Sequence, residues 1–163
     1  MTASTTLTLA DLPATSRFAR QLAPQLRGGD LVLLDGVVGA GKTTLARALI
    51  QALLGPAQEV PSPTFTLVQD YALPPFPGQP QGARLLHYDL YRLVDPEELE
   101  ELAWADVGRA DTVALVEWPN RLGAMPPGNV LHLQIALCEI NEDRELELHA
   151  YGDWVNRIGL LSL

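Results

Sequence analysis

The sequence has little lysine, little cysteine and no long apolar run. Of its 11 basic residues only Lys42 is a lysine, and the single cysteine, Cys138, excludes an intrachain disulfide and a multi-cysteine metal site. No apolar run approaches the ~20 residues that a membrane span needs. The N-terminus lacks the basic and apolar regions of a signal peptide. We therefore expect a cytoplasmic protein with no membrane association.

Positive charge is scarce overall. The 163 residues include 20 acidic and 11 basic side chains, which gives a formal net charge of -9. Because nucleic-acid affinity comes largely from Lys and Arg that neutralise phosphates, this balance disfavours direct binding of nucleic acid. If nucleic acid is involved, we expect another protein to hold it. The length and the 47% apolar fraction predict a single domain over residues 1–163.

The apolar pattern predicts alternating strands and helices. We expect strands at residues 5–9, 31–34, 66–71, 84–88 and 112–116, a β-hairpin of residues 130–140 and 145–151, and helices through residues 18–26, 42–54 and 153–161. The proline-rich segment 72–82 is predicted to be a surface loop. Another helix is expected to begin at Asp95, with Asp95 as N-cap and Glu98 as its reciprocal capping partner.

One segment matches a complete phosphate-binding loop. Residues 36–43, GVVGAGKT, fit G-x-x-x-x-G-K-[ST] between a predicted strand and a predicted helix. Lys42 would reach the β- and γ-phosphates, and the Thr43 hydroxyl would ligate Mg²⁺. A glycine-rich turn that merely starts a helix is disfavoured, because strand, lysine, threonine and helix are all in register. We predict a nucleoside triphosphate-binding α/β domain, P-loop NTPase-like and three-layered, with a central, largely parallel sheet and a C-terminal β-hairpin extension.

Hydrolysis needs further groups, a carboxylate on the metal side and something that orients water. Glu117 follows the apolar run of residues 113–116, and Asp89 follows a weaker run. Both would emerge at the carboxyl edge of a parallel sheet, beside the phosphates. Exposed strand-end carboxylates are a common alternative. Thr64 lies where many P-loop proteins sense the γ-phosphate, and ordinary loop chemistry remains its equal alternative. The three histidines have no metal-ligand spacing, so we expect them to be structural or solvent-facing.

Four segments together resemble a known family. GVVGAGKTT (36–44), SPTFTLV (62–68) followed by Tyr71, HYDLYRL (87–93) with DPEEL (95–99), and LVEWP (115–119) have the order and spacing of the TsaE family, also called YjeE. The resemblance covers about residues 12–151. It implies the ATPase subunit of the bacterial machinery that makes threonylcarbamoyladenosine in tRNA. The implied partners are the transferase-type subunit TsaD and its scaffold TsaB, with tRNA reached only through that complex, and ATP hydrolysis would service or reset the complex.

The resemblance also implies roles for individual residues. The implied catalytic residues are Lys42, Glu117, Asp89 and Thr64, and the implied Mg²⁺ ligands are Thr43, Asp89 and Glu117. Contacts to ATP are implied for Gly36, Gly39, Ala40, Gly41, Lys42, Thr43, Thr44 and Arg144. The chain departs from the family at Val37, where an acid is common; this side chain is expected to point away from the phosphates. Trp118 completes the E-W pair, and both a core position and a partner contact remain open for it.

Three other functions fit parts of the sequence. A small-molecule kinase usually needs a lid with several arginines, but the region after Trp118 offers only Arg121. A signalling GTPase would need an N-K-x-D segment, and the chain has no lysine besides Lys42. A non-enzymatic nucleotide sensor remains open as an alternative to the ATPase.

Overall fold

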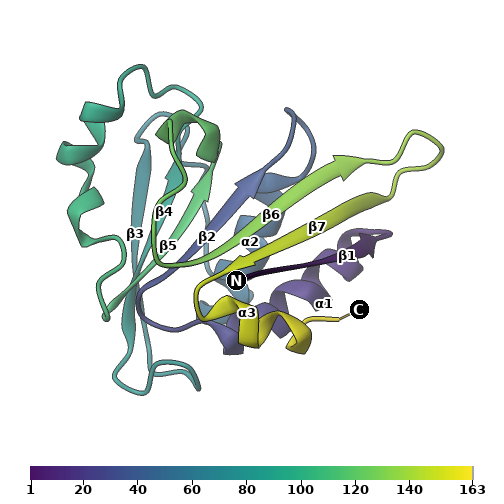
Figure 1. Ribbon diagram of the computed structural model, residues 1–163, viewed down its shortest axis with the longest axis horizontal. Coiled ribbons are helices and arrows are strands. Elements are labelled where there is room, and N and C mark those ends of the chain that lie inside the picture. The colour runs from purple at the N-terminus through teal and green to yellow at the C-terminus, as the bar shows by residue number, and fades with distance from the viewer. Residues whose placement is uncertain (163) are drawn as a thin grey trace.

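The central feature of the computed structural model, which describes residues 1–162, is a sheet of seven strands in the order β1-β7-β6-β2-β5-β4-β3 (Figure 1). The strands are β1 (Thr2–Leu9), β2 (Asp30–Asp35), β3 (Val68–Leu73), β4 (Ala83–Asp89), β5 (Thr112–Glu117), β6 (Asn129–Leu137) and β7 (Arg144–Tyr151).

The centre of the sheet is parallel and its margins are antiparallel. Strands β6, β2, β5 and β4 run in one direction. Strands β7 and β1 on one side and β3 on the other run against their neighbours. The predicted α/β fold with a largely parallel centre and a C-terminal hairpin is confirmed. In this arrangement the carboxyl ends of β2, β4 and β5 meet at one edge, where Glu117 lies opposite Asp89 on one neighbour and Leu34 on the other.

One face of the sheet is covered by α1 (Leu12–Leu22), α2 (Lys42–Leu54) and α3 (Trp154–Arg157). Apolar side chains such as Phe18, Leu49 and Trp154 are buried there against the sheet residues Leu34 and Leu115. The buried residues of α1 and α2 recur at helical spacing, so each of these two helices presents one apolar stripe to the strands. None of the helices in the described part of the chain has the length and apolarity of a membrane-crossing segment.

The opposite face is covered by 3₁₀ helices at Pro96–Leu102, Trp104–Asp106 and Pro119–Leu122. A second apolar cluster buries sheet residues such as Leu86 and Tyr88 beneath these segments. The Tyr88 hydroxyl donates to the carbonyl of Leu102 at 2.7 Å, and its ring meets Trp104 edge-on at 5.1 Å. The third layer is therefore present, but it is built from short 3₁₀ turns.

Several element boundaries differ from the prediction. The capping box at Asp95 and Glu98 is confirmed, and the segment it opens is 3₁₀-helical. Strand β3 begins at residue 68 because Leu67 has a left-handed backbone with φ 65°. Strand β6 ends at Leu137. The N–H of the next residue, Cys138, donates to the carbonyl of Asp143 across the hairpin turn at 3.1 Å. The closing helix is α3 followed by a 3₁₀ turn at Ile158–Leu160, which replaces the expected continuous helix over residues 153–161.

Candidate functional site

The phosphate-binding loop connects β2 to α2, as the motif predicts. Gly39 and Gly41 have φ values of 79° and 113°, a left-handed region that costs a side-chain-bearing residue free energy. A Cβ on either glycine would meet nothing within 4 Å, so backbone conformation rather than space requires glycine there. At Gly36 a Cβ would lie 2.5 Å from the carbonyl oxygen of Ile135, so this position also lacks room. The first residue of α2 is Lys42, which places the helix N-terminus at the loop.

Lys42 is buried at the base of this loop, with 5% of its surface exposed. Its ammonium donates to the carbonyls of Gly36 at 2.6 Å and Val37 at 2.9 Å. The same ammonium lies 3.9 Å from the centre of the Trp118 ring, a cation–π distance. Burial lowers the pKa of Lys42, and the nearby carboxylates, Glu117 first among them, oppose that shift. The loop therefore carries a buried cation that is hydrogen-bonded to the loop's own backbone.

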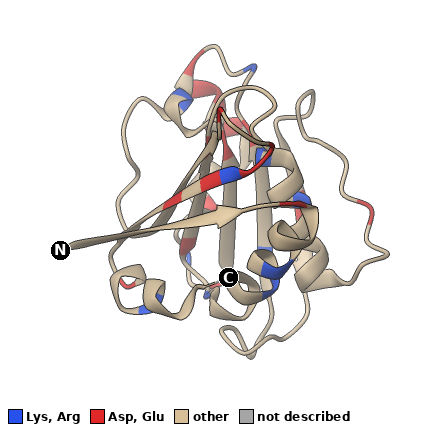
Figure 2. Cartoon of the chain, turned by 90° about the vertical axis from the view of Figure 1, so that its right-hand side faces the viewer, with Lys and Arg blue, Asp and Glu red and all other residues tan. Residues whose placement is uncertain are grey.

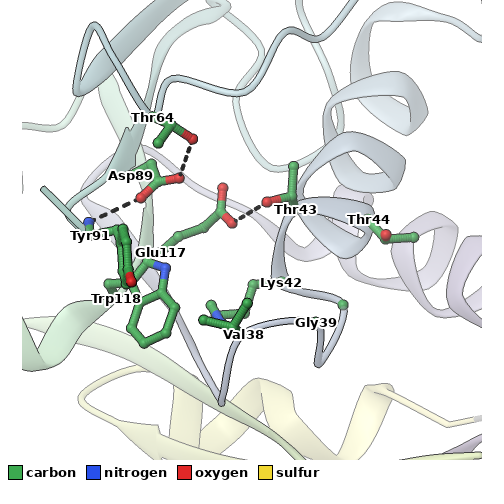
Figure 3. Close-up of a pocket in the computed structure, with 11 residues that line it drawn as sticks. Val38, Gly39, Lys42, Thr43, Thr44, Thr64, Asp89, Tyr91, Glu117 and Trp118 are labelled. Carbon is green, nitrogen blue, oxygen red and sulfur yellow. Dashed lines mark hydrogen bonds between the residues drawn. The ribbon is translucent and has the colours of Figure 1, made fainter.

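Glu117 ends β5 and is 1% exposed. One of its carboxylate oxygens accepts the Thr43 hydroxyl at 2.6 Å (Figure 3). The other oxygen lies 2.7 Å from Nε2 of His87. The residue expected to ligate Mg²⁺ on the phosphate loop is thus in direct contact with the acid expected on the metal side. Two segments separated by more than seventy residues meet here because α2 and β5 pack together.

Asp89 ends β4, the neighbouring strand, and is 5% exposed. One oxygen accepts the Thr64 hydroxyl at 3.1 Å, and the other accepts the backbone N–H of Tyr91 at 3.0 Å. The Thr64 hydroxyl also lies 2.7 Å from that of Ser62. The hydrogen bond between Thr64 and Asp89 joins the S-P-T segment to the edge of the sheet. Thr64 therefore faces the same space as the two acids (Figure 3).

A cleft of about 350 Å³ brings most of the sequence-predicted residues together. Its lining consists of Val38, Gly39, Gly41, Lys42, Thr43, Thr44, Thr64, Asp89, Tyr91, Glu117 and Trp118. Two predicted loop residues do not line it: Gly36 lies at the start of the loop, and Ala40 is fully buried behind it. Val37 is also outside this cleft and is 64% exposed.

Arg144 lies outside that cleft, in a second cavity of about 780 Å³. Its Nε donates to the carbonyl of Ala40 at 3.1 Å, which ties the first residue of β7 to the phosphate loop. Gly41 and Thr44 line both cavities, so the two spaces adjoin at the beginning of α2. Cys138 and the start of α1 complete the second cavity.

Trp118 has a left-handed backbone, with φ 60° and ψ 53°, directly after Glu117. It is half-buried, contacts the apolar cluster beneath the 3₁₀ helices, and lines the cleft. Its ring lies 4.9 Å from that of Tyr91. Trp118 therefore belongs both to the core and to the site.

Two residues of the site were missed in the sequence. Tyr91, in the HYDLYRL segment, lines the cleft, and its backbone N–H donates to Asp89. His87 is 0% exposed, so the structural one of its two expected positions applies, but its contact with Glu117 was not predicted. The signal that could have found it is strand alternation: His87 and Asp89 share a face of β4, and that face adjoins the one carrying Glu117 on β5.

The family model and the curated relatives that match this chain carry the same name. Residues 9–146 match the family model described as threonylcarbamoyl adenosine biosynthesis protein TsaE. The chain is 34% identical to the tRNA threonylcarbamoyladenosine biosynthesis protein TsaE of Rickettsia prowazekii over 85% of this chain and 96% of that protein. It is 38% identical to the protein of the same name from Haemophilus influenzae, over 74% and 70% of the two chains. The crystal structure of YdiB from Bacillus subtilis aligns with a TM-score of 0.72 and 26% identity, covering 98% of this chain and 93% of that one.

Proposed function

The chain belongs to the TsaE family of tRNA threonylcarbamoyladenosine biosynthesis proteins, and on that premise we propose that it binds and hydrolyses ATP as the ATPase subunit of this pathway. The observation that carries the proposal is the 2.6 Å hydrogen bond between Thr43 and Glu117. It joins the phosphate-loop hydroxyl to a buried strand-end carboxylate, which is the pairing that P-loop ATPases use to hold a metal ion beside the phosphates.

ATP would lie across the beginning of α2. The phosphates would rest on residues 36–44, where the helix N-terminus and the glycine-rich backbone favour an anion. Lys42 would turn from the carbonyls of Gly36 and Val37 to the β- and γ-phosphates. Because Gly41 and Thr44 line both cavities, the nucleoside would extend into the second one, toward Arg144.

The donor set fits Mg²⁺. Within residues 1–162 no group of three or more His, Cys, Asp or Glu side chains could hold a metal ion by itself. Mg²⁺ is typically bound by one or two protein oxygens together with water and phosphate oxygens, so a larger protein cluster is not needed. Thr43 and Glu117, which are in direct contact, are the residues that would hold it, and the ion would neutralise charge on the phosphates.

The contacts divide the roles of the two acids. Glu117 is hydrogen-bonded to Thr43, so we assign it to the metal side. Asp89 is hydrogen-bonded to Thr64, so we assign it to the opposite wall, where it positions the S-P-T segment toward the γ-phosphate and the attacking water. Lys42 would stabilise negative charge that develops on the transferred phosphoryl group.

The proposed partners are homologues of TsaD and TsaB, with tRNA bound only through their complex, in the cytoplasm. Figure 2 shows the basic residues on several elements, with acidic residues among them, and the formal net charge is -9. Nucleic-acid sites usually cluster such residues on one face, and this distribution therefore supports an indirect role toward tRNA.

ATP turnover with and without purified TsaB and TsaD tests the proposal. We expect slow Mg²⁺-dependent hydrolysis by the chain alone and faster hydrolysis with both partners. Tight ATP binding without turnover under either condition would replace the ATPase with a nucleotide sensor. Failure to bind ATP would overturn the proposal as a whole.

A further inference from the structure

The hydrogen bond of His87 to Glu117 is enclosed in the core. Both side chains are buried, with 0% and 1% of their surfaces exposed, and Nε2 lies 2.7 Å from the carboxylate oxygen that Thr43 does not contact. His87 lines neither the cleft nor the second cavity. It therefore reaches the site only through Glu117.

The chemistry of the pair fixes the direction of this bond. An ionised carboxylate only accepts hydrogen bonds, so Nε2 of His87 carries the proton and donates it. The other ring nitrogen, Nδ1, is buried without a hydrogen-bond partner. The only hydrogen bond of the ring is therefore the one that Nε2 makes to Glu117.

Packing alone does not account for a histidine here. An unbonded polar atom in the core costs free energy, and an aliphatic side chain would fill the same space without that cost. What the imidazole adds is a second fixed hydrogen bond to Glu117. With one oxygen held by Thr43 and the other by His87, the carboxylate has one orientation in the site.

We propose that His87 is a positioning residue: it locks the Glu117 carboxylate in the rotation that presents it to Thr43 and to the metal side of the cleft. This inference rests on the proposed ATPase function. Loss of the partner that orients a metal-site group typically lowers activity or metal affinity by about 10- to 100-fold.

Three substitutions separate positioning from packing. The amide nitrogen of glutamine extends about as far from the backbone as Nε2, so His87→Gln can still donate to Glu117. His87→Asn keeps a polar amide whose reach ends near Nδ1, and His87→Leu keeps bulk without a donor. We expect His87→Gln to retain most of the turnover, and His87→Asn and His87→Leu to lose about 10- to 100-fold in kcat and to need more Mg²⁺. ATP binding without Mg²⁺ is expected to stay close to wild type in all three.

His132→Gln is the matched control. His132 is also a strand histidine beside a carboxylate, at 3.5 Å from Asp35, but Asp35, unlike Glu117, lines neither the cleft nor the second cavity. We expect its turnover to equal that of the wild-type protein. If His87→Leu hydrolyses ATP as well as His87→Gln does, the histidine is a packing residue and the proposal is wrong.

A measurement without catalysis keeps the two proposals distinguishable. Two-bond ¹⁵N–¹H NMR correlations of the imidazole report which nitrogen carries the proton. We expect Nε2 of His87 to carry a proton, with a changed Nε2 resonance in Glu117→Gln. This result in a protein that shows no ATPase activity would leave the hydrogen bond in place and overturn only the proposed function. An Nε2 that carries no proton would overturn the positioning role even in an active enzyme.

Discussion

Two carboxylates at opposite ends of the central parallel strands are equally buried, and their partners differ in charge. Asp30 begins β2 and is 0% exposed. It accepts two hydrogen bonds of 2.7 Å from the Arg157 guanidinium and one of 2.8 Å from the backbone of Arg27. Glu117 ends the adjacent strand, and its contacts are with a hydroxyl and an imidazole.

The difference separates a structural charge from a functional one. The negative charge of Asp30 is matched by a bidentate cation, which itself stacks on Trp154 at 3.9 Å and anchors α3 to the sheet. Such a pair leaves nothing for a further cation to neutralise. The hydrogen bonds of Glu117 come from a hydroxyl and an imidazole, so in the proposed mechanism its charge is directed to the metal ion.

Removing Arg157, the cation that pairs with Asp30, is expected to have the largest effect on stability. Arg157→Ala leaves Asp30 buried without its charged partner, and breaking a buried pair in this way typically costs about 3–5 kcal/mol of unfolding free energy. Urea denaturation measures this loss. Arg27→Ala is the control: its ion pair with Asp153 is about half exposed, at 55% and 39%, so we expect a cost of about 0–1 kcal/mol. Equal losses in the two variants would remove the special status of the Asp30 pair.

Removing the cation at the functional end is expected to leave the fold and abolish the chemistry. Lys42→Ala deletes the ammonium that would stabilise the transferred phosphoryl group, an effect of about 2.7–4 kcal/mol on the transition state for groups of this type. Turnover should fall at least about 100-fold by the same measure, while circular dichroism remains that of the wild type. Undiminished hydrolysis would show that Lys42 has no catalytic role.

Substitutions of Glu117 and Asp89, the two acids of the cleft, test which of them acts on the metal side. Glu117→Gln and Asp89→Asn keep the side-chain shape and remove the charge, so each should reduce Mg²⁺-dependent turnover more than nucleotide binding. We expect the larger loss of kcat, about 100-fold, in Glu117→Gln, because only this acid contacts Thr43. Steady-state turnover of each variant gives kcat, and titration with ATP gives the dissociation constant of the nucleotide. Normal turnover in both variants would reduce these acids to ordinary strand ends.

His132 and Asp35 provide the smallest test, since this pair is only partly buried, at 12% and 33% exposed. Burial lowers the pKa of His132 below its ordinary 6.5, and Asp35 opposes that shift. A histidine with a lowered pKa is protonated more readily in the unfolded chain, so its stabilising contribution is present above pH 6.5 and decreases as the pH falls through the folded-state pKa. Unfolding free energies of wild type and His132→Gln, measured between neutral and mildly acidic pH, should converge on acidification. A constant difference would contradict the shift.

The parts of the molecule that could be predicted are those encoded by neighbouring residues. The phosphate loop, the strand before it and the capping box at Asp95 depend on motifs a few residues long. The contacts of His87 with Glu117 and of Asp30 with Arg157 span 30 and 127 residues. These contacts can be predicted only when the strand order and register are known, and short sequence motifs specify neither.

The pairing of β1 with β7 has a consequence for the timing of folding. Leu9 lies opposite Arg144, so about 135 residues must be synthesised after the first strand before the pairing can begin. At the roughly 5–20 residues per second of protein synthesis, this strand waits about 7–27 s for its partner. Its sequence, TASTTLTL, is rich in threonine and poor in large apolar side chains, which suits a segment that spends that interval in water. Strand β1 is therefore the first strand of the sheet to be synthesised, but it can pair only after β7 has been made.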